Sequence, residues 1–179
     1  MENETISYVT LRTNTENLSQ LLRTCFLKHN ISPTTSMVRW KAHGGIGMIL
    51  NVDGSSIGNL GVSGFGGLIR NSDGEWVHGF AGNIGFSNIL HAELLAVYHD
   101  LVLAWELNIK DLWCYSDSKT VIKLLSDHRV RLVHTLRERN TCADFLAKIG
   151  ARNSEAYSRI VFSLDGMSLL LLADASGTP

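Results

Sequence analysis

Apolar and polar positions follow a strand-like pattern in the first half of the central region. Residues Met48–Asp53 form an apolar run that ends in a polar turn, and Gly61–Arg70 and Trp76–Ile84 follow as two more such stretches. The turn residues Gly58-Asn59 and Asp73-Gly74 separate them at the short spacing that is typical of hairpins. This pattern predicts three antiparallel strands in sequence order.

The apolar spacing then becomes helical. Between Ile89 and Leu107 apolar residues recur every three to four positions, and Ser87 or Asn88 precedes them as a helix cap. Shorter segments alternate after this helix: strands at 112–115 and 130–136, and helices at 118–125 and 140–150, the last capped by Asn140 and closed by Gly150. A helix between two strands favours a right-handed parallel crossover. We therefore expect an α/β fold with a mixed five-stranded sheet and helices on its faces.

The segments on either side of this region look different. In residues 1–46 the apolar spacing predicts an N-terminal helix around Leu18–Phe26. Pro33 then breaks the helical pattern, so we expect a linker after this helix. We expect the folded domain to span residues 47–152 and residues 153–179 to form a C-terminal tail. The Leu169–Leu172 run is too short to span a bilayer, and the acidic N-terminus does not resemble a signal peptide. We expect a monomer that is intracellular, nuclear or cytoplasmic, and not secreted.

Composition and charge bound the function. The chain has 179 residues, is 45% hydrophobic and carries a formal net charge of −1, which describes one globular domain. Its three scattered cysteines predict neither a disulfide framework nor a Cys-x-x-Cys zinc site. From Ser118 to Arg152 eight basic residues outnumber three acidic ones, whereas the first 117 residues are acidic overall. Such asymmetry permits a phosphate-binding face, although solvated helix faces account for it equally well.

Four short motifs each set one carboxylate among small or polar residues. They are Asp53-Gly54-Ser55, Ala92-Glu93-Leu94, Ser116-Asp117-Ser118 and Asn140-x-x-Ala143-Asp144. Carboxylates that come together need a counter-charge, and two Mg²⁺ ions supply it while clamping a phosphodiester. Each carboxylate also has an ordinary explanation. Asp53 could begin a β-turn and Asp117 could cap the helix that follows it. Glu93 and Asp144 lie near the starts of helices, where a negative charge interacts favourably with the helix dipole. The hypothesis therefore depends on the four motifs occurring together.

These motifs and the order of elements resemble the type 1 ribonuclease H domain, most closely its plant branch derived from retroelement reverse transcriptases. The resemblance covers roughly residues 48–150, with Leu169–Gly177 as a candidate extension. It implies hydrolysis of the RNA strand of an RNA–DNA hybrid, with two Mg²⁺ ions or with Mn²⁺ in their place. It also implies four metal-binding carboxylates and a histidine that assists proton transfer or product release, here Asp53, Glu93, Asp117, Asp144 and His134.

An active site of this kind needs a surface for its nucleic-acid partner, the RNA–DNA hybrid. Three polar residues near the carboxylates are candidates for hydrogen bonds to 2′-hydroxyl groups, namely Ser55, Asn83 and Asn88. Four basic residues are candidates for contacts with the flanking phosphates, namely Lys119, Lys123, Arg137 and Arg139.

Other interpretations remain open. The family normally carries a further helix between the short helix and the last strand, and that segment is missing between Ser126 and Arg131. The deletion favours a catalytically lapsed, retroelement-derived domain that keeps the fold and binds nucleic acid or serves as a scaffold. His91 and His99 flank Glu93 and suggest zinc, but oxygen ligands favour Mg²⁺ or Mn²⁺. A resolvase or integrase with the same fold would cut DNA instead.

Overall fold

The structure is a computed structural model that describes residues 47–176, except residue 59 and the segments 110–111 and 126–131. The expected N-terminal helix and linker at 1–46 lie outside the described residues. The shortened connection at 126–131 also lies outside them.

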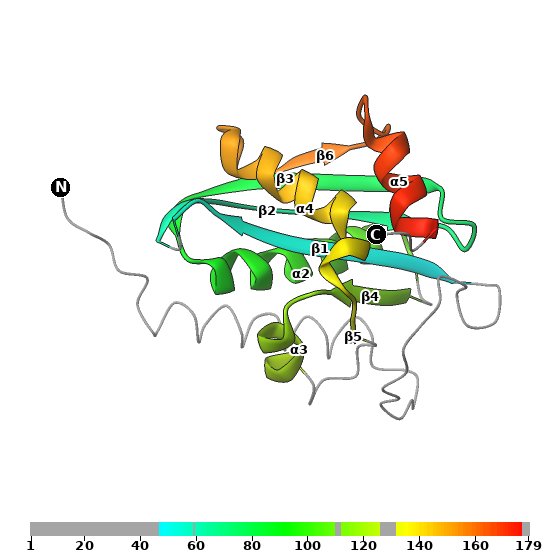
Figure 1. The fold of residues 1–179 in the computed structure, drawn as a ribbon, viewed down its shortest axis with the longest axis horizontal. Helices are drawn as coiled ribbons and strands as arrows, with labels where there is room; N and C mark the ends of the chain where they lie inside the picture. Colours follow the sequence, from blue (N-terminus) through cyan, green and yellow to red (C-terminus); the bar gives the residue numbers. More distant parts are fainter. Residues whose placement is uncertain (1–46, 59, 110–111, 126–131, 177–179) are drawn as a thin grey trace.

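A six-stranded mixed sheet forms the centre of the molecule (Figure 1). Strands β1 (Met48–Ser56), β2 (Gly61–Arg70) and β3 (Trp76–Ser87) make the antiparallel meander that the sequence predicts. Strand β4 (Leu112–Ser116) runs parallel to β1, and β5 (Leu132–His134) runs parallel to β4. The order across the sheet is β5-β4-β1-β2-β3-β6. The predicted mixed sheet is confirmed, with one strand more than the five expected.

The two main helices lie on opposite sides of the sheet, α2 (Ile89–Glu106) on one face and α4 (Thr141–Arg152) on the other (Figure 1). Glycines in the strands let both helices approach closely. A Cβ atom on Gly54 would lie 2.5 Å from the backbone nitrogen of Glu93 in α2, and one on Gly66 would lie 2.5 Å from that of Ala147 in α4. Any larger residue at either position would push a helix away from the sheet.

Two smaller helices complete the central part. Helix α3 (Lys119–Leu125) follows β4, and the 3₁₀ helix η1 (Arg137–Arg139) leads from β5 into α4. The main core lies between α2 and the sheet, where Leu50, Val52 and Phe65 pack with Val97 and Leu101 at 0–1% exposure. None of the described helices is long and apolar enough to cross a membrane.

The segment expected to be a C-terminal tail belongs to the same folded unit. Strand β6 (Ser158–Ile160) pairs with β3, and α5 (Met167–Ser176) packs beside α4 (Figure 1). Buried Met167 joins Leu68, Cys142 and Leu146 in a second core cluster. The strand has only three residues and the helix carries a run of four leucines on all sides, so neither shows a clear period in the sequence, which is why the pattern predicted neither.

Candidate metal centre and nucleic-acid interface

Three carboxylates from three separate elements meet at one point of the sheet. One oxygen each of Asp53 in β1, Glu93 in α2 and Asp117 after β4 lie within 4.8 Å of one another. The parallel register pairs Asn51 with Tyr115, so the residues two positions later, Asp53 and Asp117, lie side by side. The close approach of α2 brings Glu93 to the same point. The structure thus brings together three of the four carboxylates that the sequence motifs contain.

The ordinary explanations for these three residues do not fit the structure. Asp53 lies inside β1 at 4% exposure rather than in a turn, and its Oδ1 accepts a hydrogen bond from the Gly54 backbone N–H. Glu93 lies beyond the first turn of α2. The Ser118 hydroxyl accepts a hydrogen bond from the Val121 backbone N–H and caps α3, so Asp117 is not needed as the cap.

Burial and mutual repulsion hold the carboxyl groups towards their neutral forms. Burial, followed by the charges of Asp117 and Asp144, raises the pKa of Asp53 to about 8. Burial, followed by the charges of Asp53 and Asp117, raises the pKa of Glu93 to about 9. Burial is also the main cause that raises the pKa of Asp117. The nearby Arg137 guanidinium lowers all three pKa values without cancelling the increase.

The donor set fits a divalent cation. Glu93 is only 7% exposed, and its Oε2 has no hydrogen-bond partner among the described residues. A buried carboxylate oxygen without a partner is costly unless a cation or a proton satisfies it. Three carboxylates with only oxygen ligands suit Mg²⁺ or Mn²⁺. Asp53, Glu93 and Asp117 would be the residues that hold such an ion.

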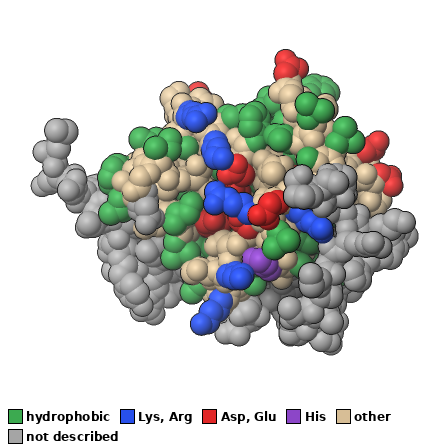
Figure 2. Space-filling model, in the orientation of Figure 1, with side chains coloured by type: hydrophobic (Ala, Val, Ile, Leu, Met, Phe, Trp, Pro, Cys, Tyr) green, Lys and Arg blue, Asp and Glu red, His purple; other side chains and the backbone are tan. Residues whose placement is uncertain are grey.

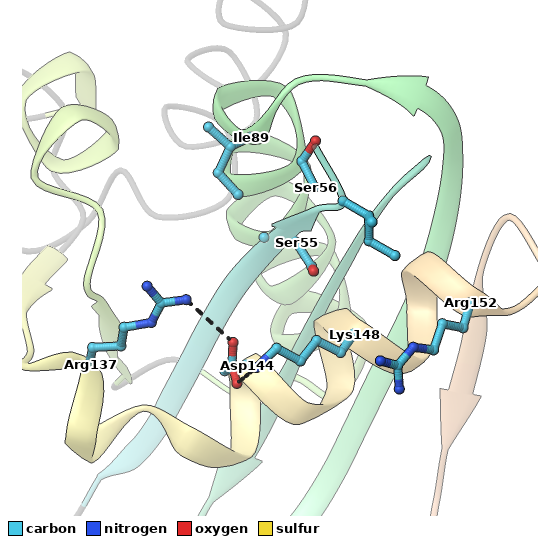
Figure 3. A pocket seen from close by; sticks show the side chains of 9 residues that line it. Ser55, Ser56, Ile89, Arg137, Asp144, Lys148 and Arg152 are labelled. Carbon is cyan, nitrogen blue, oxygen red and sulfur yellow. Dashed lines mark hydrogen bonds and ion pairs between the residues drawn. The ribbon is translucent and has the colours of Figure 1, made fainter. Parts of the chain in front are cut away.

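The fourth predicted ligand, Asp144, lies near this cluster but is not part of it. Its charge helps to raise the pKa of Asp53, yet its oxygens contact two cations instead. Lys148 Nζ donates to Asp144 Oδ2 at 2.5 Å, and Arg137 Nη2 lies 3.8 Å from Oδ1 (Figure 3). The structure therefore groups three of the four carboxylates, with the fourth held by ion pairs at the rim.

Asn140 positions Asp144, although not as the helix cap that the sequence predicts. Its side chain makes no capping hydrogen bond to α4. The buried amide instead donates to the Val52 carbonyl oxygen at 2.9 Å and accepts from Asn51 Nδ2 at 3.2 Å. These two bonds fasten the start of α4 to β1 beside Asp53.

The cap of α4 comes from the C-terminal helix. Asp174 in α5 is fully buried and accepts hydrogen bonds from the backbone N–H groups of Thr141 and Cys142 and from the Thr141 hydroxyl. Its other partner is buried Arg70 in β2, at 2.6 Å. Sequence reasoning missed this arrangement because a cap is normally sought within a few residues of the helix, and Asp174 lies 33 residues beyond Thr141.

Gly150 does not close α4 either. The helix continues to Arg152, and a Cβ atom at Gly150 would lie 2.5 Å from the Gly82 carbonyl oxygen in β3. This glycine is therefore required for close packing on the sheet rather than for a helix end. The Asn83 side chain donates to the carbonyl oxygens of Gly150 and Ala151 near that end of the helix.

His134 ends β5 and is exposed at the rim of the cluster. The register of β4 and β5 pairs Ser116 with His134, which places the histidine beside Asp117, and its charge lowers the pKa of that aspartate. The two histidines that flank Glu93 in the sequence serve the fold. His91 Nδ1 hydrogen-bonds the Ser87 hydroxyl, and His99 stacks on the Phe65 ring at 4.6 Å. Neither belongs to the metal-ligand group found among the described residues.

The candidate nucleic-acid contacts fall into two groups. Ser55 lines a pocket together with Arg137 and Asp144, whereas the side-chain oxygen of Asn88 caps α2 by accepting from the His91 N–H. Asn83 is similarly committed to α4. The predicted basic residues lie on α3 (Lys119 and Lys123) and η1 (Arg137 and Arg139).

Two further cations in the same pocket were missed by sequence reasoning. Lys148 and Arg152 follow Asp144 at intervals of four residues, so all three lie along one side of α4 (Figure 3). The four-residue spacing was the signal that would have found them. Figure 2 shows acidic side chains gathered at the middle of this face with Lys and Arg side chains around them.

Comparisons with known proteins show what this chain is similar to. Residues 51–130 match the family described as reverse transcriptase-like. Over 151 residues the chain is 32% identical to an Arabidopsis thaliana protein named "Putative ribonuclease H protein", an alignment that covers 72% of this chain and 24% of the relative. The chain thus spans about a quarter of that relative's length.

Solved structures share the fold. The N-terminal ribonuclease H domain of a Mycobacterium tuberculosis protein superimposes with a TM-score of 0.54 and 24% identity, covering 60% of this chain and 94% of that one. LC11 ribonuclease H1, solved in complex with an RNA/DNA hybrid, gives a TM-score of 0.52 and 20% identity over 59% of this chain and 96% of that one. The chain carries a ribonuclease H-like domain of the plant retroelement type. The three clustered carboxylates described above lie within this domain.

Proposed function

We propose that this ribonuclease H-like domain is an endoribonuclease that hydrolyses the RNA strand of RNA–DNA hybrids and depends on divalent cations, with Mg²⁺ as the physiological ion. The observation that carries the proposal is the convergence of Asp53, Glu93 and Asp117 within 4.8 Å, where one Glu93 oxygen has no hydrogen-bond partner in the described part of the chain. Buried carboxylates that face one another cost stability unless a cation lies between them.

The chain's own residues suit such a reaction. Asp53, Glu93 and Asp117 would hold the ions, and Asp144 lies near enough to the cluster to act on the charge of Asp53. Two bound ions supply an activated water and stabilise the leaving oxygen in phosphodiester hydrolysis. His134 stands beside Asp117, exposed to solvent, where it can take a proton from the site or give one to the leaving group.

Substrate selection follows from the surroundings of the cluster. Ser55 faces the pocket next to the carboxylates and is the polar side chain best placed to meet a 2′-hydroxyl group, which distinguishes RNA from DNA. The basic side chains on α3, η1 and α4 would bind backbone phosphates without reading sequence. We therefore expect cleavage that depends on the type of nucleic acid and on salt, but little on base sequence.

The competing function is a catalytically lapsed domain that binds nucleic acid or serves as a scaffold. The observation in its favour is the short connection between α3 and β5, where the family normally carries another helix. A purified protein that binds hybrid but never cuts it would establish this second function.

The test is cleavage of a labelled RNA–DNA hybrid by purified protein in MgCl₂ and in EDTA, with double-stranded RNA and DNA of the same sequence alongside. The proposal predicts metal-dependent cutting of the RNA strand of the hybrid alone. His134→Ala should slow turnover about tenfold without abolishing it. A folded protein that leaves the hybrid intact at every Mg²⁺ and Mn²⁺ concentration would overturn the proposal.

A further inference from the structure

The placement of Asp144 points to a coupling between metal binding and phosphate binding. In this structure its carboxylate is shared by two cations, Lys148 on α4 and Arg137 on η1 (Figure 3). The three remaining carboxylates already form a compact group to which Asp144 does not contribute. The side chain that would complete the site is therefore occupied by positive charges that the chain itself supplies.

We propose that Asp144 exchanges partners: a divalent cation at the carboxylate cluster takes Asp144, and this releases Lys148 and Arg137 to bind phosphates of the nucleic acid. The inference rests on the proposed function, because it assigns the same site. It adds two phosphate-binding residues whose availability depends on the metal, one of which, Lys148, sequence reasoning did not find.

The ion pairs are weak enough to exchange. The Lys148 and Arg137 side chains are 49% and 74% exposed, whereas the Asp144 carboxylate is 21% exposed. Exposed ion pairs contribute little to stability because water screens them. A divalent ion brings twice the charge and accepts carboxylate oxygens directly, so it competes well for Asp144.

The released cations would lie where a phosphate backbone passes. Both line one pocket together with Ser55, Ser56 and Arg152, on the surface that borders the carboxylates. Arg137 also lies close enough to lower the pKa values of Asp53 and Glu93. Arg137 therefore lines the pocket and also interacts with the charges of the cluster, so a change in the charge of the cluster alters what Arg137 binds.

Thermodynamic linkage makes this exchange measurable. If metal binding frees cations for phosphate, then the metal strengthens nucleic-acid binding and nucleic acid strengthens metal binding by the same factor. Removing Lys148 should reduce that factor. It should also raise the affinity for metal alone, since the competing cation is gone.

The experiment compares hybrid affinity with and without metal. A fluorescent RNA–DNA hybrid is titrated with protein in EDTA and in CaCl₂ at equal ionic strength, and the ratio of the two dissociation constants is the coupling factor. Ca²⁺ accepts the same oxygen ligands in a looser geometry, so it is used to fill the site without turnover. Electrophoresis of the recovered probe checks that the RNA is intact.

Arg152→Gln is the matched control for Lys148→Gln. Arg152 lies in the same pocket, one helical turn beyond Lys148, and both changes remove one positive charge. The exchange predicts that Lys148→Gln lowers the coupling factor about threefold or more and tightens Mg²⁺ binding in calorimetry. Arg152→Gln should weaken hybrid binding equally in EDTA and in CaCl₂, leaving the coupling factor unchanged.

Three outcomes would overturn the exchange. Equal coupling factors in the native protein and Lys148→Gln would show that Lys148 is not released. An equal decrease of the coupling factor in Arg152→Gln would show that any lost positive charge in the pocket has this effect, so that Lys148 has no special role. Failure of the native protein to bind Mg²⁺ or Ca²⁺ would remove the metal site, and with it the proposed function. The first two results leave metal-dependent cleavage intact, so the two proposals fail separately.

Discussion

Two clusters of buried charge lie near the first turn of α4, and they are built in opposite ways. Asp174 is fully buried, pairs with buried Arg70 and accepts three more hydrogen bonds from Thr141 and Cys142. Asp53 and Glu93 are nearly as buried but face other carboxylates. Within the part of the chain that the structure describes, the first cluster contains its own opposite charge. The second, called the uncompensated cluster below, consists of carboxyl groups, and the nearby Arg137 lowers their pKa values only in part.

This difference indicates that the Asp174 cluster stabilises the fold and that the carboxylate cluster forms the candidate site. A buried charge that has its partners costs little to keep and fixes the relative positions of β2, α4 and α5. A buried charge without partners is retained at a cost to stability, which is typical of residues kept for binding or catalysis. The Asp174 cluster holds α4 in place, so it supports the cluster that α4 helps to form.

The largest expected effect is the loss of hydrolysis when the uncompensated cluster loses a charge. Asp53→Asn keeps the side-chain shape but removes a ligand charge, so Mg²⁺-dependent cleavage of the hybrid should fall at least about 1,000-fold while the fold persists. Asp117→Asn should behave in the same way. Asp73→Asn, in an exposed turn, is the control and should cleave at the native rate. A native rate in Asp53→Asn would refute the site.

The next effect should appear when the compensated cluster is broken. Asp174→Ala leaves Arg70 buried and the start of α4 without its cap, so the free energy of unfolding should fall by about 3–5 kcal/mol. Urea denaturation followed by circular dichroism measures it.

A double variant sharpens this comparison. Arg70→Met with Asp174→Leu removes both charges and should recover most of the lost stability, since apolar pairs often replace buried ion pairs at little cost. If Asp174→Ala is as stable as the native protein, the C-terminal helix does not hold α4.

The pH dependence of stability should reveal the uncompensated cluster. The folded-state pKa values of Asp53 and Glu93, about 8 and 9, lie above their ordinary values near 4. Between these limits the folded protein binds more protons than the unfolded chain, so its stability falls as pH rises. In EDTA we expect stability to fall between pH 5 and 8 with a slope of up to about 1.4 kcal/mol per pH unit for each of the two carboxyl groups. Urea denaturation in MgCl₂ should show a flatter dependence, and an equal slope with and without Mg²⁺ would contradict this view.

The smallest effect concerns a buried acid outside both clusters. Asp100 in α2 is fully buried, burial raises its pKa well above the usual range, and neither carboxylate oxygen has a hydrogen-bond partner among the described residues. Asp100→Ala should therefore stabilise the protein by about 1–2 kcal/mol at pH 8, measured by the same denaturation. The gain should shrink at pH 5, where protonation costs less. A destabilised variant would mean that the packing contacts of the Asp100 side chain contribute more to stability than the burial of its carboxyl group costs.

Local patterns predicted much of the fold and named the three carboxylates that the structure brings together. The alternating strands and the apolar face of α2 follow from spacing alone, and the register that brings Asp53 beside Asp117 follows from a parallel crossover. The caps were predicted less well. Asn88 does cap α2, but Asn140 reaches back to β1, and α4 is capped by Asp174 from the other end of the domain. Such long-range partners leave no periodic signal in the sequence.

The position of Asp144 could not be predicted for a related reason. Its motif fits the family, but its side-chain direction depends on the competition between Lys148, Arg137 and the carboxylates nearby. Sequence spacing predicts which residues share a region, whereas the balance of charges decides which of them pair.

Calorimetric titration of Mg²⁺ into the metal-free protein at pH 7 tests the central claim most directly. Because the pKa values of Asp53 and Glu93 lie above 7, a cation that binds there must displace protons. We predict saturable binding whose heat changes with the ionisation enthalpy of the buffer, and a smaller proton release in Asp53→Asn. No binding by the folded native protein, or binding without proton release, would contradict the claim that this cluster is built for a metal.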